Sequence, residues 1–272
     1  MEQHGKNPQQ NVYAIIPARY ASVRLEGKLL LPVAGKPLIL HTLEQAGKAR
    51  TVSRVIVATD DERIRRVVEE AGGEAVLTSS DHRSGSDRIA EVARELPENS
   101  IIVNVQGDEP LISPATIDSA VEALLEDASA DISTTCEAIA DHADVLNPDI
   151  VKVVCDEQGF ALYFSRSPVP YPRDAVREFG DLETALRRGP GLAGRYRKHT
   201  GLYVFRREYL LKFTEMGQTV LEKTEMLEQL RALENGARIK VIETLESSIG
   251  VDTAEDLERV RKQLETPAEI YG

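Results

Sequence analysis

The chain has 272 residues, of which 42% are hydrophobic and 29% charged, ordinary values for a globular protein of one large domain or two small ones. Its net charge of −12 argues against nucleic acid as a main partner, so any anion site must be a local basic pocket. No apolar run approaches the roughly 20 residues of a membrane span, so no membrane insertion is expected.

The first segment, residues 1–11, is polar and lacks the apolar region of a signal peptide. We therefore predict a disordered leader and a cytoplasmic location. The two cysteines, Cys136 and Cys155, lie in predicted strands without metal-ligand spacing, which indicates buried, reduced thiols.

Apolar, β-branched runs alternate with helical patterns through the first half of the chain. Strands are predicted at 12–16, 54–59, 74–78 and 101–105, and helices at 37–49, 61–72 and 85–96. This alternation predicts an α/β fold whose mostly parallel central sheet is covered by helices on both faces. Such sheets bind ligands beyond the carboxyl ends of their strands, where the charged loops 17–36, 78–88 and 106–110 lie.

The second half mixes a hairpin with helices and further strands. Runs at 151–156 and 161–166 flank a predicted turn at Glu157–Gly159, and residues 167–198 are predicted to be an irregular excursion. Strands at 198–205 and 238–244 and a closing helix at 254–264 complete the pattern. We predict one domain over residues 12–264, with an arm at about 150–200 and a tail at 265–272.

The first charged loop follows a strand that is predicted to break at Pro17, and it carries Arg19, Arg24 and Lys28. Fixed cations near a helix N-terminus favour polyphosphate, although these side chains could equally be solvated loop charges. Neither Gly27-Lys28 nor Gly35-Lys36 precedes the hydroxyl residue of a P-loop, and no GxGxxG follows a strand. Both common phosphate motifs are therefore excluded.

Asp108 follows the most apolar strand, directly after a glycine. A carboxylate at this position suits Mg²⁺, and the alternative is a turn before the helix that starts near Pro114. Asp252 is a candidate second metal ligand, next to a predicted capping box formed by Thr253 and Asp256. In the loop 80–88, small residues would allow close approach of a ligand, although an N-capped helix start is equally compatible, and His82 is interpreted as structural.

Several segments together resemble the 3-deoxy-manno-octulosonate cytidylyltransferases of bacteria, the CMP-Kdo synthetases. They include PARYASVRLEGK, DHRSGSDRIAEV, VNVQGDEPLI, ALYFSRSPVPYPRD, KHTGLYVFRREYL and GVDTAEDLERV, and in order they cover nearly all of residues 12–264. The resemblance implies a Rossmann-like nucleotidyltransferase domain with a smaller hairpin insertion, typically a homodimer with contacts from the arm. It also implies transfer of CMP from CTP to Kdo, with Mg²⁺ and release of pyrophosphate, for lipopolysaccharide synthesis.

The resemblance also implies roles for individual residues. The residues expected to bind CTP are Ala18, Arg19, Ser22, Arg24, Lys28, Ser84, Gly85 and Arg88. The expected catalytic residues are Lys28, Asp108 and Asp252, of which the two aspartates would bind the metal. The residues expected on the sugar side are Gln106, Arg166, His199, Tyr203, Glu225 and Gln229.

The chain departs from the family at two positions, because Glu26 and Leu29 stand where the usual RLPGKPL has proline. Loss of proline predicts a more mobile loop, and Glu26 adds negative charge beside a polyanion site. The alternatives are the same chemistry on another acid sugar (an 8-amino analogue of Kdo or a sialic acid) or a non-catalytic nucleotide-binding protein. Arg166 and His199 would suit a sugar carboxylate, the alternative being that they pack under the arm.

Overall fold

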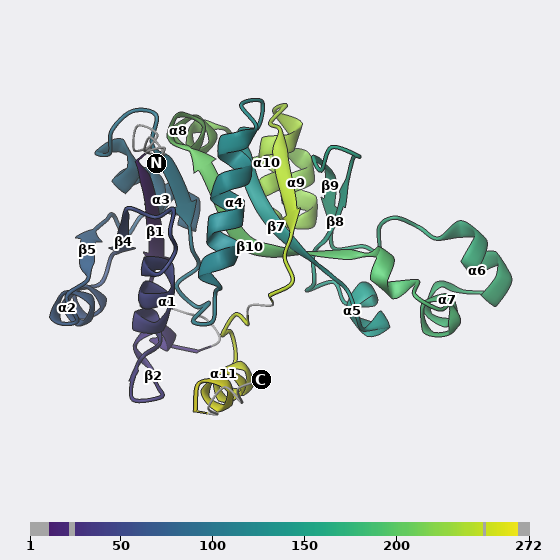
Figure 1. Ribbon diagram of the computed structural model, residues 1–272, viewed down its shortest axis with the longest axis horizontal. Coiled ribbons are helices and arrows are strands. Elements are labelled where there is room, and N and C mark those ends of the chain that lie inside the picture. Colours follow the sequence, from purple (N-terminus) through teal and green to yellow (C-terminus); the bar gives the residue numbers. More distant parts are fainter. Residues whose placement is uncertain (1–10, 22–24, 247–248, 266–272) are drawn as a thin grey trace, which may run out of the picture. The chain divides into compact units, whose positions relative to one another are not determined.

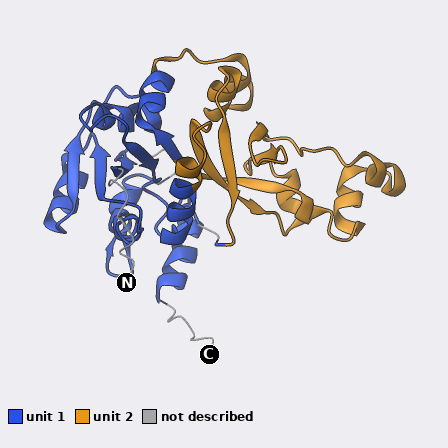
Figure 2. Ribbon diagram, turned by 45° about the horizontal axis from the view of Figure 1, so that its top comes forward, with its two compact units in different colours: residues 1–122, 204–214, 246–272 blue, residues 123–203, 215–245 orange. Residues whose placement is uncertain are grey.

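The computed structural model describes residues 11–21, 25–246 and 249–265. The chain forms two compact units, unit 1 with residues 1–122, 204–214 and 246–272, and unit 2 with residues 123–203 and 215–245 (Figure 2). The predicted leader and tail lie almost entirely outside the described residues.

Unit 1 is built on four parallel strands in the order β5-β4-β1-β6 (Figure 1). They are β1 (Val12–Ala18), β4 (Arg54–Thr59), β5 (Glu74–Leu77) and β6 (Ile101–Asn104). The expected break at Pro17 is wrong, since β1 continues to Ala18. The partner strand β6 pairs with β1 only as far as Ile15, so the proline lies where the ladder on that side has already ended.

The helices α1 (Leu38–Gly47), α2 (Glu62–Glu70) and α3 (Gly85–Arg94) connect these strands. The chain moves outward from β1 to β4 and β5, and then returns across β1 to β6. Because parallel crossovers are right-handed, this reversal places α3 on the opposite face from α1 and α2, which explains the predicted two-sided cover. The loops after β1 and β6 diverge at the reversal, where open α/β sheets bind ligands.

The remaining parts of unit 1 are short or peripheral. A 3₁₀ turn (Lys28–Leu30) and the small hairpin β2 (Pro32–Val33) and β3 (Lys36–Pro37) follow β1, and α8 (Arg207–Glu215) and α11 (Ala254–Glu265) come late in the chain. The helix α4 (Pro114–Glu126) passes from unit 1 into unit 2.

Unit 2 contains the predicted hairpin, in which β8 (Lys152–Cys155) and β9 (Ala161–Ser165) pair antiparallel. On its other edge β8 pairs with β10 (Arg197–Arg206), and β7 (Ile132–Ala138) pairs in parallel with β11 (Ile239–Glu243). Three short helices complete this part: α5 (His142–Leu146), α9 (Val220–Glu225) and α10 (Gln229–Glu234).

The arm is more regular than the expected excursion over 167–198. It holds α6 (Arg173–Phe179), α7 (Leu182–Arg188) and a 3₁₀ turn (Ala193–Arg195). These elements share a small core of their own, formed by Ile139, Val145, Ala185, Leu186, Leu192, Ala193 and Tyr196. Each helix is only 7 residues long, too short for a clear apolar periodicity.

The two cysteines differ in environment, which corrects the expectation that both are buried. Cys136 is buried in β7, and burial raises the pKa of its thiol to about 12. Cys155 is exposed at the end of β8, beside the irregular pairing with β9. Within the described part of the chain, no helix is long and apolar enough to span a bilayer.

Candidate active site

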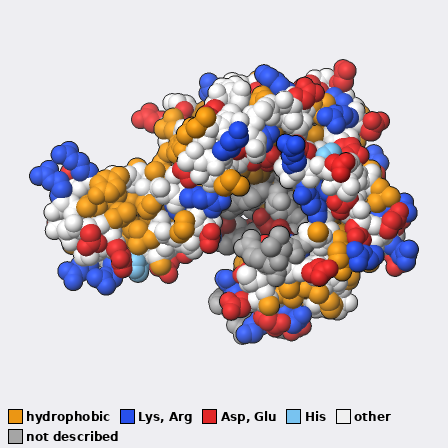
Figure 3. Space-filling view, turned by 180° about the vertical axis from the view of Figure 1, so that it is seen from behind, with side chains coloured by type: hydrophobic (Ala, Val, Ile, Leu, Met, Phe, Trp, Pro, Cys, Tyr) orange, Lys and Arg blue, Asp and Glu red, His pale blue; other side chains and the backbone are white. Residues whose placement is uncertain are grey.

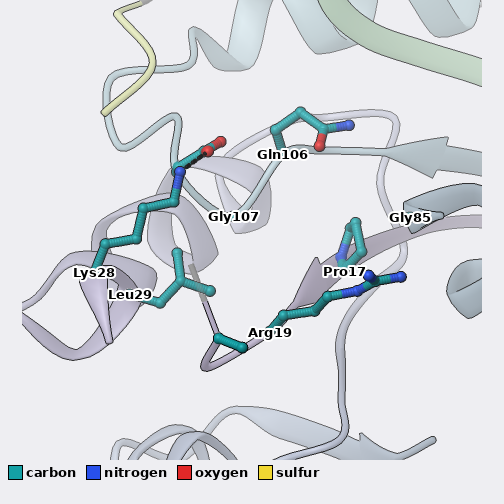
Figure 4. A pocket seen from close by; sticks show the side chains of 9 residues that line it. Pro17, Arg19, Lys28, Leu29, Gly85, Gln106 and Gly107 are labelled. Atoms are coloured by element: carbon teal, nitrogen blue, oxygen red, sulfur yellow. Dashed lines mark hydrogen bonds and ion pairs between the residues drawn. The ribbon is translucent and has the colours of Figure 1, made fainter. Parts of the chain in front are cut away.

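A pocket of about 260 Å³ lies in unit 1 where the loops after β1 and β6 diverge. Arg19 and Lys28 approach it from the segment after β1, and Gln106 approaches it from the segment after β6 (Figure 4). Its full lining is Pro17, Arg19, Ala21, Lys28, Leu29, Gly85, Gln106, Gly107 and Asp108. The pocket thus gathers predicted phosphate-side residues and Gln106, which the resemblance places on the sugar side.

Gly107 allows the loop after β6 to lie directly on β1. A Cβ at this position would be 3.2 Å from the carbonyl oxygen of Pro17 and 3.2 Å from Cδ1 of Ile39, closer than side chains normally pack. The buried hydroxyl of Thr42 donates a hydrogen bond of 3.1 Å to the carbonyl oxygen of Gly107 and fixes the loop further. Asp108 is thereby held at the edge of the pocket.

Lys28 joins the two predicted metal ligands. Its Nζ donates to Oδ2 of Asp108 at 2.5 Å, to Oδ1 of Asp252 at 3.0 Å and to the carbonyl oxygen of Val251 at 2.9 Å. Burial alone would lower the pKa of Lys28, but the two carboxylates outweigh it and raise the pKa above its ordinary value. The ammonium group therefore stays charged at neutral pH.

The segment before α11 brings Asp252 to this position. The backbone N–H of Val251 donates to the carbonyl oxygen of Asp108 at 2.9 Å, which ties the two loops together. The predicted capping box is confirmed: Thr253 N donates to Asp256 Oδ2 at 3.0 Å, and Asp256 N donates to Thr253 Oγ1 at 3.2 Å. The role of Val251 was missed, because nothing in the sequence relates this segment to Asp108.

The loop at 80–88 supports the pocket from the side of α3. Arg19 donates from Nη2 to the carbonyl oxygen of His82 at 2.7 Å, and the ring of His82 contacts Glu91, in keeping with the structural interpretation of this histidine. Ser84 and Asp87 form a capping box at the start of α3, so the N-capped alternative describes this loop correctly.

Arg88 turns away from the pocket and is fully buried. Its guanidinium donates to Asp60 Oδ2 at 2.6 Å and to the hydroxyl of Thr78, residues that follow β4 and β5. Of the other residues expected to bind CTP, Ala18 is the buried last residue of β1, while Ser22 and Arg24 lie outside the described residues.

In unit 2, several hydrogen bonds join the segment at Arg166 to Glu225. Glu225 accepts hydrogen bonds from Ser165 Oγ at 2.7 Å and from the backbone N–H of Arg166 at 2.9 Å. The Arg166 guanidinium donates from Nε to the carbonyl oxygen of Glu225 at 2.7 Å and from Nη1 to that of Pro148 at 2.9 Å.

His199 and Tyr203 lie together on β10. The His199 ring is 5.0 Å from the Phe164 ring and 5.2 Å from the Tyr203 ring, and its Nε2 lies 2.9 Å from Thr134 Oγ1. Burial lowers the pKa of His199 to about 3 and raises that of Tyr203, so both side chains are neutral at neutral pH. Gln229 is buried at the start of α10.

Lys152 is a buried, charged residue that was not identified from the sequence. Its Nζ donates to three backbone carbonyl oxygens, those of Asn147 at 2.9 Å, Ile150 at 2.6 Å and Arg166 at 2.6 Å. Arg166 is therefore held at its carbonyl oxygen by Lys152 and at its N–H by Glu225. A lysine inside a predicted strand next to valines is the one signal that could have indicated this role.

Comparisons with known proteins agree with this architecture. Residues 13–241 match the profile of a family described as cytidylyltransferase. A 3-deoxy-manno-octulosonate cytidylyltransferase of Geotalea uraniireducens is 54% identical over 253 residues, which cover 93% of this chain and 98% of the relative. That of Geobacter sulfurreducens is 51% identical over 256 residues, with 93% and 99% covered. The chain belongs to the 3-deoxy-manno-octulosonate cytidylyltransferase family.

The structural comparison confirms the predicted nucleotidyltransferase fold of this cytidylyltransferase. A solved structure of a CMP:2-keto-3-deoxy-manno-octonic acid synthetase complexed with CTP is 39% identical and superposes with a TM-score of 0.83. The match covers 94% of this chain and 98% of the solved chain. Enzyme class and fold, both predicted from the sequence, are therefore established.

Most of the described residues predicted for this cytidylyltransferase fall into two groups. Around the pocket of unit 1 lie Arg19, Lys28, Gly85, Gln106 and Asp108, and Asp252 joins them through Lys28. The other predicted sugar-side residues (Arg166, His199, Tyr203, Glu225 and Gln229) all belong to unit 2.

Proposed function

We propose that this chain transfers CMP from CTP to 3-deoxy-D-manno-octulosonate (Kdo), with release of pyrophosphate, and so supplies CMP-Kdo for lipopolysaccharide synthesis. The observation that carries the proposal is the meeting of Lys28, Asp108 and Asp252 at the pocket of unit 1. This chain is also 39% identical to a synthetase that was solved with CTP.

Asp108 and Asp252 fit a magnesium ion by the chemistry of their donor atoms. Both present carboxylate oxygens to a single positive charge, the Lys28 ammonium, so the place already favours a cation. Mg²⁺ takes hard oxygen ligands and commonly uses one or two carboxylates together with substrate phosphates. When bound, the ion would supply charge neutralisation on the phosphates and on the leaving pyrophosphate.

The chain's own residues would act by position and charge. Arg19 and Lys28 offer fixed positive groups to the phosphates of CTP at the pocket. The anomeric 2-hydroxyl oxygen of Kdo would attack the α-phosphorus in line, forming the new P–O bond as the bond to the β-phosphate bridging oxygen breaks. The hydroxyl proton leaves to solvent, and no side-chain nucleophile takes part.

An acidic sugar suits the group around Arg166 in unit 2. The Arg166 guanidinium is held in one orientation by the carbonyl oxygens of Glu225, Pro148 and Met226, and its positive charge would attract the sugar carboxylate with little loss of freedom. His199 would bind as a neutral hydrogen-bonding group, because its lowered pKa removes the positive charge expected of an anion partner.

A homodimer and a cytoplasmic location are further parts of this proposal. Several large apolar side chains of unit 2 are exposed: Leu162, Tyr171, Val220 and Met226. Hydrophobic side chains also gather on the lobe formed by α6 and α7 (Figure 3). Such surfaces are typical of a subunit contact, which supports the dimer predicted for the arm.

An assay with every combination of four nucleotides and three sugars tests the proposal. Pyrophosphate release is measured with CTP, ATP, GTP and UTP, each with and without Mg²⁺ and with Kdo, 8-amino-Kdo or a sialic acid. We expect release with CTP, Mg²⁺ and Kdo together. Release with a sialic acid but not with Kdo would make the substrate assignment wrong, and no release with any combination would leave a non-catalytic nucleotide-binding protein.

A further inference from the structure

Glu26 adds a negative charge to the segment that would bind CTP phosphates, and nothing in the proposed reaction uses it. Its side chain is exposed and lies two residues before Lys28. The surroundings of this segment in unit 1 nevertheless contain a compensating group. We propose that Arg63, on α2 and outside the pocket, is a positioning residue that holds Tyr20 and Gly27 in place beside Arg19 and Lys28 and offsets the charge of Glu26. This inference rests on the proposed function of the pocket.

The two sides of the segment are joined at Tyr20 and Gly27. The backbone N–H of Gly27 donates to the carbonyl oxygen of Tyr20 at 3.2 Å. Gly27 has a φ of +64°, and a Cβ there would lie 3.0 Å from atoms of the Tyr20 ring. Glycine is thus required twice, by the left-handed backbone and by the close approach of the ring. Arg19 and Lys28 are the immediate neighbours of this junction.

Arg63 covers the Tyr20 ring from α2. Its guanidinium carbon is 3.3 Å from the ring centroid, a stacking distance. Asp61 fixes the guanidinium by accepting from Nε at 3.0 Å and from Nη2 at 2.6 Å. Because Asp61 also caps α2, by accepting from the Arg63 N–H at 2.9 Å, the stacked arginine is anchored to the start of a helix.

The negative charge of Glu26 also influences the pKa of Arg63. The hydrogen bond that Arg63 donates to Asp61 is the main influence that raises the pKa of Arg63, and Tyr20 and Glu26 add to it. Arg63 therefore stacks on the aromatic ring, and the negative charge of Glu26 favours its positive charge. This arrangement explains how the chain carries Glu26 in place of a stiffening proline: the stack takes over the restraint that proline would give, and the positive charge offsets the carboxylate.

The test compares substitutions on the exposed surface of α2. Arg63→Ala removes the stack and the charge, and we expect it to raise the KM for CTP about fivefold while kcat and the KM for Kdo stay within twofold. Adding Glu26→Gln to Arg63→Ala should restore part of the CTP affinity. Arg65→Ala is the matched control, because Arg65 is also a partly exposed arginine of α2, pairs with Glu62 and Glu69 on the same helix, and should change nothing.

A second pair of variants separates the ring from the charge. Tyr20→Leu removes the stacking surface and should weaken CTP binding like Arg63→Ala, whereas Tyr20→Phe keeps the ring and should behave as the parent protein. Because Arg63 is exposed, the melting temperature of its variants should not change, which separates positioning from a general loss of structure.

Calorimetric binding of tripolyphosphate gives a readout that does not depend on turnover. If the parent protein binds tripolyphosphate more tightly than Arg63→Ala but makes no CMP-sugar, the proposed function fails while this inference stands. Equal binding by the two proteins, no binding by either, or an equal loss in Arg65→Ala would overturn the inference.

Discussion

The pocket of unit 1 and the Arg166 group of unit 2 hold their charged side chains in opposite ways. At the pocket, Lys28 bonds mainly to the carboxylates of Asp108 and Asp252. The charged groups of these three residues lie at or beside the cavity. In unit 2, Lys152 bonds to three backbone carbonyl oxygens, and so does the guanidinium of Arg166. The first arrangement leaves charges that a ligand can rearrange, and the second uses charge to fix the backbone.

This difference predicts how substitutions will act. A side chain at the pocket contributes mostly to the reaction, because its partners are other side chains that a charged ligand would also bind. A side chain such as Lys152 contributes mostly to folding, because its loss takes a hydrogen-bond donor away from several backbone carbonyl oxygens. Substitutions in the two regions test whether their charged side chains differ in this way.

The largest effect is expected from Asp108→Asn. The substitution keeps the shape of the side chain but removes the charge that would bind magnesium, so kcat should fall by about a thousandfold. The melting temperature should change little. Asp81→Asn, at an exposed aspartate in the loop before α3, is the control and should keep full activity. Activity of Asp108→Asn near that of the parent would show that this carboxylate does not serve the reaction.

A smaller effect, on stability, is expected from Lys152→Met. The variant removes the Nζ donor from the carbonyl oxygens of Asn147, Ile150 and Arg166, of which that of Asn147 keeps the N–H of Ile150 at 3.2 Å. Relief of the buried charge offsets part of the cost. We expect the free energy of unfolding to fall by about 2 kcal/mol, measured by urea denaturation. Lys223→Met, at an exposed lysine of α9, should leave it unchanged. Equal stability of the two variants would contradict a structural role for Lys152.

The smallest effect is a pH dependence that His199→Gln should remove. The unfolded chain takes up a proton at His199 below about pH 6.5, whereas burial lowers the pKa in the folded state to about 3. Stability is therefore lost as pH falls below about 6.5, by about 1 kcal/mol between pH 6.5 and 5.5. Urea denaturation between those values should give a flatter pH profile for the variant. Parallel profiles would show that His199 titrates alike in both states.

The strands and helices of unit 1 were predictable because local patterns determine them. Near-continuous apolar strands alternating with amphipathic helices specify a parallel sheet, and the order of the strands then places the loop with Arg19 next to the loop with Asp108. The capping box at Thr253 and Asp256 was likewise readable from spacing.

The meeting of Asp108 with Asp252 was not predictable from pattern, since it depends on one backbone hydrogen bond between distant segments, from Val251 to Asp108. The helices of the arm were missed because they are short and pack only on a small local core. The sugar-side residues of unit 2 came from the resemblance alone, as no local spacing distinguishes His199 or Glu225 from ordinary strand and helix residues.

The most direct test of the account is to follow the phosphorus atoms of CTP by ³¹P nuclear magnetic resonance during incubation with Kdo and Mg²⁺. Attack at the α-phosphorus predicts one phosphodiester resonance of a CMP-sugar and pyrophosphate in equal amounts, with CTP unchanged when Kdo is left out. Formation of CDP and inorganic phosphate, or persistence of CTP in the complete mixture, would contradict it.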